Sequence, residues 1–415
     1  MTAQLDVTLH GRLVATITNI AGDINVVAIE RDFADDPNAP TLSFKAFRDP
    51  VTGKYRDAIR PTRTRAHPYF ANLLPEGPMR AYLAERANVK PVRDFPLLGL
   101  LGADLPGALV MLDHDEPTSV ESVPDPELAE IADDREKPLR FSLAGVQLKF
   151  SAAGTPQRGL TIPAGGLGGS WIVKLPDQRF IRVPENEYAM MTFARMVGID
   201  VPEVGLVDPN DVAGIPSDMR HLTGKALYIK RFDRLADGSR VHTEDFAQAN
   251  GLYPEQKYTY FNFDRLGAQV AEVMGGDAAL DLVQRIVFTI GIGNGDMHAK
   301  NWSAIYRDGR TPSLAPAYDY VSTVVYVPGD DMGMTLAGTK KFSDVDDALI
   351  ARFASRMRMP RKPVLDAAHD MVDRMREAWP QLGEGTPLMS EHRALLEAHI
   401  GTIPLFGPRT ALARR

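Results

Sequence analysis

The chain has 415 residues, of which 44% are hydrophobic and 24% charged, a composition typical of a folded globular protein rather than a disordered or fibrous one. Its formal net charge is −7, which argues against binding nucleic acid through bulk charge. There are no cysteines, so disulfides, cysteine zinc sites and thiol nucleophiles are excluded together. At roughly 150 residues per domain, the length predicts two or three domains.

The sequence shows neither a secretion signal nor a membrane helix. Residues 1–19 alternate apolar and polar side chains and include Asp6, unlike a signal peptide. The longest apolar stretch, 95–112, is interrupted by Asp104 and Pro106, whereas a membrane helix needs about 20 apolar residues in a row. We therefore expect a cytoplasmic protein with no membrane association.

The first third of the chain combines strand and helix patterns. Residues 5–30 have the period-2 alternation and Gly-containing turns of short strands, and residues 69–87 have apolar side chains near helical spacing. Residues 113–138 contain ten acidic residues, two basic residues and four prolines. This composition predicts a solvated linker.

The remaining sequence is first β-rich and then helical. Further strands are predicted at 139–150, 160–163, 171–175 and 227–232, with a helix at 184–197. The later helices are predicted at 263–274, 278–290, 348–356 and 363–378. A β-rich lobe followed by a helical lobe is the layout of an α+β, protein-kinase-like fold.

The Gly-rich segment 291–303 is the most informative for chemistry. It contains Asp296 and Asn301, five residues apart. Kinases use an Asp to orient and deprotonate the acceptor hydroxyl, and an Asn five residues later to bind Mg²⁺. Asp319 would supply the second carboxylate ligand that Mg²⁺ prefers. These spacings predict phosphoryl transfer.

Two further residues of this segment have less defined roles. Lys300 could neutralise charge on the transferring phosphoryl group. His298 is either a structural residue that holds the loop by hydrogen bonds or an acid–base group. A metallohydrolase site built from Asp296, His298 and Asp319 is an alternative, although it would leave Lys300 without a role.

The β-rich part should supply phosphate contacts. Lys174 ends an apolar strand, where an unpaired ammonium would be costly, and its predicted partner is Glu187 on the next helix, with Glu185 as the substitute. No G-x-x-x-x-G-K-[ST] motif is present, so the chain is not a P-loop NTPase. The segment 142–149 is the better candidate for a phosphate loop because it joins small residues, a hydroxyl and a Lys to a strand.

Together these segments resemble the HipA family, the kinase toxins of bacterial type II toxin–antitoxin pairs. The resemblance lies in seven segments: Leu73–Glu76, Phe141–Lys149, Ile172–Lys174, Asn186–Tyr188, Arg231–Arg234 with His242–Gln248, Gly293–Asn301 and Ala315–Asp319. The match runs in order from about residue 70 to residue 340. Its most specific element is Gly-Asp-x-His-x-Lys-Asn followed by Tyr-Asp.

The resemblance implies a role for each matching position. Asp296 would be the catalytic base, and Asn301 and Asp319 would hold Mg²⁺. The other positions implied to bind ATP are Lys174 at the phosphates with its partner Glu187, Lys230, Arg231 and Phe232 at the adenine hinge, Tyr318, and the phosphate loop of Ala144, Gly145, Val146, Gln147 and Lys149. Ser142 corresponds to the serine that family members autophosphorylate, which switches the kinase off.

The resemblance also implies an organisation and partners. The expected parts are an N-terminal subdomain at 1–112, an acidic linker at 113–138, a β-rich kinase N-lobe at 139–240 and a helical catalytic C-lobe at 241–415. Family members act in persistence, phosphorylate translation proteins such as aminoacyl-tRNA synthetases, and are restrained by HipB, a helix-turn-helix antitoxin. Operator DNA would be bound mainly through that antitoxin.

Two other functions remain open at this point. The Asp-x4-Asn arrangement is shared by small-molecule and lipid kinases. A chain that binds ATP and co-represses with an antitoxin, without kinase activity, is the third hypothesis. Retention of Asp296, Asn301, Asp319 and Lys174 favours an active serine/threonine protein kinase.

Overall fold

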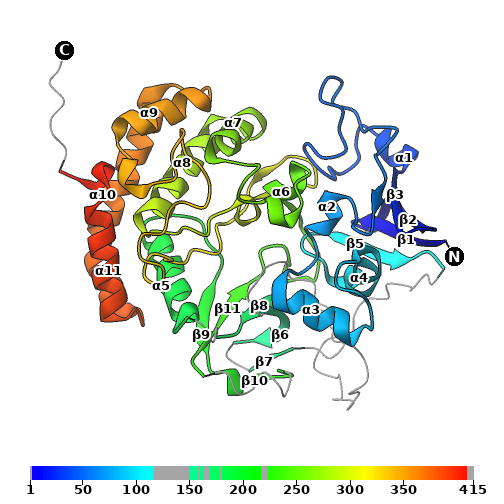
Figure 1. The fold of residues 1–415 in the computed structure, drawn as a ribbon, viewed down its shortest axis with the longest axis horizontal. Coiled ribbons are helices and arrows are strands. Elements are labelled where there is room, and N and C mark those ends of the chain that lie inside the picture. The colour runs from blue at the N-terminus through cyan, green and yellow to red at the C-terminus, as the bar shows by residue number, and fades with distance from the viewer. Residues whose placement is uncertain are drawn as a thin grey trace. The chain divides into compact units, whose positions relative to one another are not determined.

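The computed structural model describes residues 2–115, 149–156, 159–162, 169–176, 180–215 and 223–408. Its contacts divide the chain into two compact units. The first comprises Met1–Ile181, Gly205–Glu255 and Ser303–Ala315, and the second comprises Arg182–Val204, Gln256–Trp302 and Pro316–Arg415. The sheets belong to the first unit and the long helices to the second (Figure 1). These units cut across the four segments expected from the sequence.

The N-terminal part of the first unit is a five-stranded antiparallel sheet in the order β4-β3-β2-β1-β5. Its strands are β1 (Ala3–Leu9), β2 (Arg12–Ile20), β3 (Ile24–Ile29), β4 (Thr62–Arg63) and β5 (Leu109–Asp113). Leu5, Val7 and Leu9 of β1 are buried and alternate with more exposed residues, which is the reason for the period-2 pattern. The strands expected within 5–30 are confirmed.

Short helices accompany this sheet: α1 (Arg31–Ala34), α2 (Pro68–Ala71), α3 (Gly77–Arg86) and α4 (Asp94–Leu101). The single helix expected at 69–87 is wrong, because α2 and α3 are separate. Pro75 lies between them and disfavours helical backbone at the residue that precedes it. The apolar spacing therefore continues across a break in the helix.

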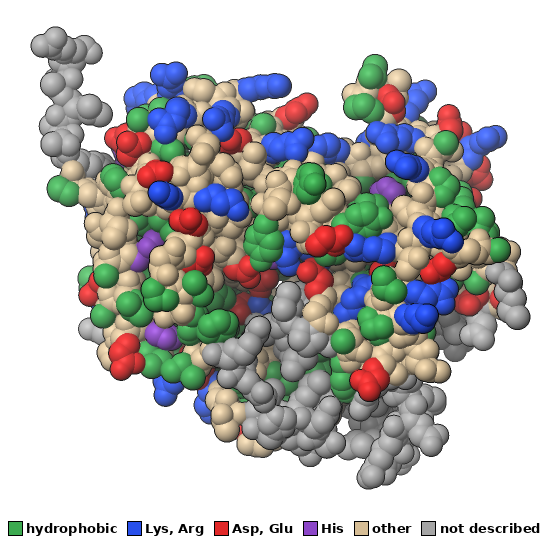
Figure 2. Space-filling model, viewed as in Figure 1, with side chains coloured by type: hydrophobic (Ala, Val, Ile, Leu, Met, Phe, Trp, Pro, Cys, Tyr) green, Lys and Arg blue, Asp and Glu red, His purple; other side chains and the backbone are tan. Residues whose placement is uncertain are grey.

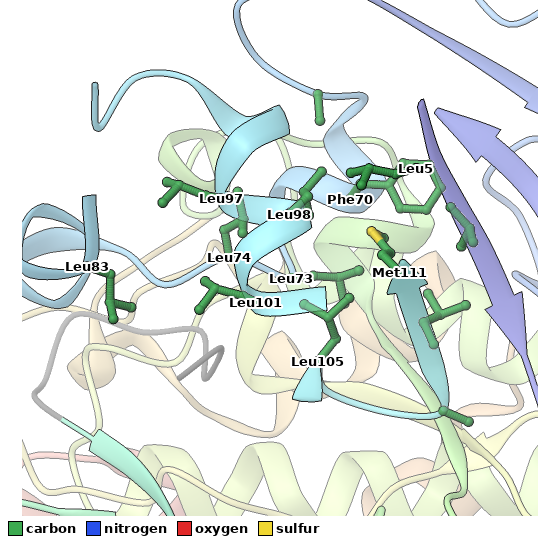
Figure 3. Packing of buried hydrophobic residues seen from close by; sticks show 14 of the residues in the cluster. Leu5, Phe70, Leu73, Leu74, Leu83, Leu97, Leu98, Leu101, Leu105 and Met111 are labelled. Atoms are coloured by element: carbon green, nitrogen blue, oxygen red, sulfur yellow. The ribbon is translucent and has the colours of Figure 1, made fainter. Parts of the chain in front are cut away.

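The core beside this sheet is rich in leucine. Leu97, Leu98 and Leu101 of α4 lie beside Leu73 and Leu74 (Figure 3). The apolar run 95–112 thus forms a helix and then a strand, separated around Asp104, as its interruption indicated. The same buried cluster includes Phe150 and Val173 of the next sheet, so the N-terminal region shares a core with the β-rich lobe.

The second sheet has six strands in the order β10-β7-β6-β8-β11-β9. They are β6 (Lys149–Thr155), β7 (Gly159–Thr161), β8 (Trp171–Lys174), β9 (Val204–Val207), β10 (Val212–Ala213) and β11 (Ala226–Lys230). A small third sheet joins β12 (His242–Asp245), β13 (Ser303–Tyr306) and β14 (Ser313–Leu314), beside α6 (Phe246–Ala249). The strands expected at 160–163, 171–175 and 227–232 are confirmed. Of the strand expected at 139–150, only its last two residues are described.

The second unit consists mainly of helices. They are α5 (Val183–Met196), α7 (Phe263–Val273), α8 (Gly276–Gly291), α9 (Asp347–Arg356), α10 (Arg361–Gly385) and α11 (Ser390–Gly401). The five helices expected in this part are confirmed, and α10 extends beyond its expected end at residue 378. Within the described residues, no helix is both long enough and apolar enough to cross a membrane. Acidic and basic side chains are mixed over the face shown in Figure 2.

Candidate functional site

The residues predicted for phosphotransfer fall on both compact units. The first unit carries Lys149, Lys174, Lys230, Arg231 and Phe232, and the second carries Glu187, Asp296, His298, Lys300, Asn301, Tyr318 and Asp319. Ser142, Ala144, Gly145, Val146 and Gln147 lie outside the described residues, as do residues 116–138 of the expected linker.

Asn294 organises the loop that follows α8 in the second unit. Its buried side-chain amide donates a hydrogen bond to the Asp319 carbonyl oxygen at 3.1 Å, and its Oδ1 accepts one from the Asp296 backbone N–H at 3.0 Å. One side chain thus joins the backbones of two residues that are 23 positions apart. Because a buried amide with both ends bonded is costly to displace, this arrangement fixes the loop.

Asn301 completes this cluster. Its Nδ2 donates to the Asp296 carbonyl oxygen at 3.2 Å, so the amide oxygen lies at the opposite end of the group and is the part that can serve as a ligand. Together with the Asp319 carboxylate, it makes the combination of amide and carboxylate oxygens that suits Mg²⁺. The donor set therefore fits the expected metal. Among the described residues, no group of three or more His, Asp or Glu could hold a metal ion.

Asp296 is exposed, but several groups surround its carboxyl. Desolvation by these neighbours raises the pKa of Asp296, and the nearby carboxylates of Asp319 and Asp330 act in the same direction. A hydrogen bond donated by the Tyr258 hydroxyl to Oδ1 and the positive charge of Lys257 act against this shift. A carboxylate whose pKa is raised toward neutrality is a more effective general base than an ordinary one.

His298 and Lys300 are buried within the same loop. The His298 ring lies edge-on to Tyr258, with ring centroids 5.0 Å apart, and its carbonyl oxygen accepts from the Asn301 N–H at 2.9 Å. The Lys300 carbonyl oxygen accepts from the Tyr318 hydroxyl at 2.8 Å. Through these contacts His298 and Tyr318 help to hold the conformation of the loop. The chemical roles of His298 and Lys300 stay predictions.

The helix α5 contributes a further anchor to the second unit. The Asn186 side chain donates to the Ser322 carbonyl oxygen at 2.9 Å and accepts from the Ser322 N–H at 3.1 Å. This pair fixes the chain three residues beyond Asp319. Glu187 and Glu185 are both buried on the same helix. Because Lys174 belongs to the other unit, its pairing with Glu187 stays a prediction.

Two predicted phosphate-contacting lysines lie together in the first unit. Lys149 of β6 and Lys174 of β8 are directly opposite residues in an antiparallel pair, so their side chains project from the same face of the sheet. Lys174 is 5% exposed, and burial of its positive charge is costly unless a negatively charged group lies nearby. Two ammonium groups on one face are suited to a polyanion such as a triphosphate.

The predicted hinge begins at Lys230, the last residue of β11. Lys230 is opposite Trp171 in the sheet, and the Arg231 N–H donates to the Ser170 carbonyl oxygen at 2.8 Å. The Arg231 side chain is buried and forms ion pairs with Asp104 and Asp233, which is a structural task. Since this N–H is already used within the protein, backbone recognition of adenine would fall to other groups of Lys230–Phe232, and it stays a prediction.

Sequence reasoning missed Asn294, Tyr258 and the buried ion pairs of Arg231. Asn294 stands within the Gly-Asn-Gly-Asp pattern, directly ahead of the predicted base, so a search for residues that hold the loop could have found it. Tyr258 lies 38 positions before Asp296 and shares no motif with it. No local signal identifies that partnership.

Comparison with known proteins gives consistent results along the chain. Residues 5–112 match the HipA N-terminal domain, and residues 141–379 match the HipA-like C-terminal domain. A Sinorhizobium fredii protein, Y4dM, named only as a proposed kinase, is 45% identical over 97% of each chain. The serine/threonine-protein kinase toxin HipA of Shewanella oneidensis is 26% identical, over 80% of this chain and 81% of the relative.

A solved structure shows the same fold. It is a complex of Shewanella oneidensis MR-1 HipA with HipB and operator DNA, and it matches with a TM-score of 0.72 and 21% identity over 97% of this chain and 96% of that chain. The architecture is therefore the α+β, kinase-like fold expected from the sequence. With both domain models matched in order and a relative at 45% identity, the chain belongs to the HipA family.

Proposed function

We propose that this chain is an ATP- and Mg²⁺-dependent serine/threonine protein kinase that acts as the toxin of a toxin–antitoxin pair. The observation that carries the proposal is the loop in which Asn294 joins Asp296 to Asp319 and Asn301 donates to Asp296. Phosphoryl transfer needs a base and metal ligands held close together, and this loop supports that arrangement.

In the proposed reaction, Asp296 orients the acceptor hydroxyl and takes its proton as the oxygen attacks. Asn301 and Asp319 would hold Mg²⁺, which supplies charge neutralisation for the phosphates when bound. Lys149 and Lys174 would contact the phosphates from one face of their sheet. The loop around the base is already hydrogen-bonded, so its geometry does not have to be organised at the moment of transfer.

Mass spectrometry after incubation with Mg-ATP tests this proposal. We expect the wild type to gain one phosphate at Ser142 and Asp296→Asn to gain none. Because the base acts on the acceptor, nucleotide affinity of the variant should stay within about an order of magnitude of the wild type. Full activity of Asp296→Asn would contradict the assignment of the base. Bound nucleotide without phosphate gain in the wild type would favour a co-repressor or a small-molecule kinase.

The proposed partners are a HipB-like helix-turn-helix antitoxin and a protein of translation, such as an aminoacyl-tRNA synthetase. The related HipA was solved with HipB and operator DNA, which supports the first proposal. With a net charge of −7, this chain would rely mainly on the antitoxin for DNA contact. A search for a helix-turn-helix protein encoded beside the gene, followed by co-purification of the two proteins, tests the antitoxin. Comparison of phosphoproteins after expression of wild type and Asp296→Asn tests the substrate class.

A further inference from the structure

Tyr258 lies against the proposed catalytic base, although no motif connects the two residues. Its hydroxyl donates to Oδ1 of Asp296, and the edge-on contact of its ring with His298 fixes the plane of the ring. Tyr258 therefore contacts two residues of the loop after α8, the proposed base Asp296 and His298.

The neighbouring residue anchors the same segment. The Lys257 carbonyl oxygen accepts from the Ala299 N–H at 3.3 Å, so the backbone before Tyr258 is bonded to the loop that contains Asp296. Lys257 is buried, and its ammonium lies 5.5 Å from the centroid of the Tyr258 ring. The position of the Tyr258 hydroxyl is therefore set by a backbone bond and by contacts on its ring.

A hydrogen bond to one carboxylate oxygen determines what the other oxygen can do. A carboxylate turns about its Cβ–Cγ bond, and a donor held at Oδ1 restricts that rotation. Because Oδ1 already accepts the Tyr258 hydroxyl, Oδ2 is the better placed oxygen to accept the acceptor hydroxyl. We propose that Tyr258 is a positioning residue for phosphotransfer, which holds Oδ1 of Asp296 so that Oδ2 takes the proton. This inference rests on the proposed kinase function.

Tyr258→Phe removes the hydroxyl and keeps the ring against His298. We expect the rate constant of self-phosphorylation at saturating Mg-ATP to fall by roughly 10-fold to 100-fold, since misplacing a catalytic group has effects of that size. The ATP concentration at half-maximal rate and the affinity for a non-hydrolysable Mg-ATP analogue should not change. Tyr260→Phe is the matched control because Tyr260 is 61% exposed and lies two residues away.

A double variant and a spectroscopic measurement separate positioning from a structural effect. Asp296→Asn should show no phosphate by mass spectrometry, so its slow residual transfer is followed with radiolabelled ATP. In that background Tyr258→Phe should reduce the residual rate no further, because both changes act through one group. With 3-fluorotyrosine at position 258, Asp296→Ala should shift the fluorine NMR resonance. This measurement detects the hydrogen bond and does not depend on kinase activity.

The outcomes distinguish this inference from the proposed function. A wild-type rate in Tyr258→Phe overturns the positioning role, and so does a faster rate, which would mean that the tyrosine blocks the base. Absence of the fluorine shift also overturns it. A wild type that transfers no phosphate contradicts the kinase proposal instead, while the fluorine measurement still tests the contact.

Discussion

Removing one charge from a buried ionic cluster in the first unit should destabilise that unit strongly. Asp104 accepts from Nη1 of Arg231 at 3.0 and 3.2 Å and from Nη2 of Arg234 at 2.8 Å. Asp233 accepts from both arginines as well. The four side chains are between 1% and 10% exposed. Within these four side chains two positive and two negative charges balance, and the half-buried Arg240 adds a further positive charge nearby.

The variant Asp104→Asn leaves this cluster with one uncompensated positive charge. Breaking a buried pair in this way costs about 3–5 kcal/mol, against a typical total stability of about 5–15 kcal/mol. Burial alone acts to raise the pKa of Asp233, yet the guanidinium groups of Arg231 and Arg234 outweigh it and hold that pKa below its usual value. The charges thus stabilise each other strongly, so the loss of one should lower the free energy of unfolding by the whole of this cost.

Urea unfolding, with amide hydrogen exchange of peptides from the first unit, measures the loss. The matched control is Asp23→Asn, which breaks a pair with Arg93 at 2.8 Å whose side chains are 21% and 38% exposed. Because solvent screens that pair, its loss should cost less than about 1 kcal/mol. Adding Arg234→Met to Asp104→Asn should recover part of the stability by restoring neutrality. A cost for Asp104→Asn as small as that of the control would refute the reasoning.

Three further predictions concern the loop and a buried carboxyl. Asn294→Ala should lower phosphotransfer by at least about tenfold while the first unit unfolds unchanged, because it frees both Asp296 and Asp319; equal activity in a phosphate-incorporation assay would contradict this. Asp319→Asn should weaken binding of Mg-ATP itself, measured by calorimetry, and unchanged affinity would remove it from the metal site. Burial raises the pKa of Glu244 to about 7, against hydrogen bonds from Ser43, Tyr306 and the Phe44 N–H. The pKa of this glutamate in the unfolded chain is about 4.3. The contribution of Glu244 to stability is therefore greatest below about pH 4.3 and is lost as the pH rises through about 7. The stability of Glu244→Gln relative to wild type should therefore increase from pH 5 to pH 8. Unfolding midpoints of both proteins at each pH measure this, and a difference between the proteins that is the same at both pH values would show that this carboxyl does not titrate in that range.

The comparison with wild type matters for Glu244 because a neighbouring group has the opposite dependence. Burial lowers the pKa of His242 to about 4, so its contribution is present above the unfolded value near 6.5 and is lost as the pH falls. The stability of the whole chain therefore mixes both effects. The difference between wild type and Glu244→Gln isolates the carboxyl, provided that His242 is unchanged.

Local patterns predicted much of the secondary structure. The helix α9 was expected at 348–356 and lies at Asp347–Arg356, because its apolar residues repeat with the helical period and its first turn is capped by Asp346. The break between α2 and α3 was missed, since apolar spacing alone does not register the effect of Pro75 on the preceding residue. Periodicity reports which face is buried and not whether the helix is continuous.

The candidate site shows the same division. Asp296 and Asn301 were identified because kinase chemistry fixes their spacing within one loop, and Asp319 because it follows in a second recognisable segment. Asn294 and Tyr258 were not identified as partners of Asp296, since a hydrogen-bond donor for a carboxylate can come from any segment that passes nearby. The residues proposed to carry out the chemistry can thus be identified from the sequence, while the residues that position them cannot.

The sequence by itself determined the family pattern, the order of β-rich and helical parts, and the positions of the proposed base and metal ligands. These follow from short-range features: periodicity, turn residues and fixed spacing. The tertiary structure alone decided that Asp104 would neutralise Arg231, 127 positions away, and that the tyrosine at 258 would bond the base. The physical reason is that a buried polar group must be satisfied, but its partner is whichever residue the packed chain brings within reach.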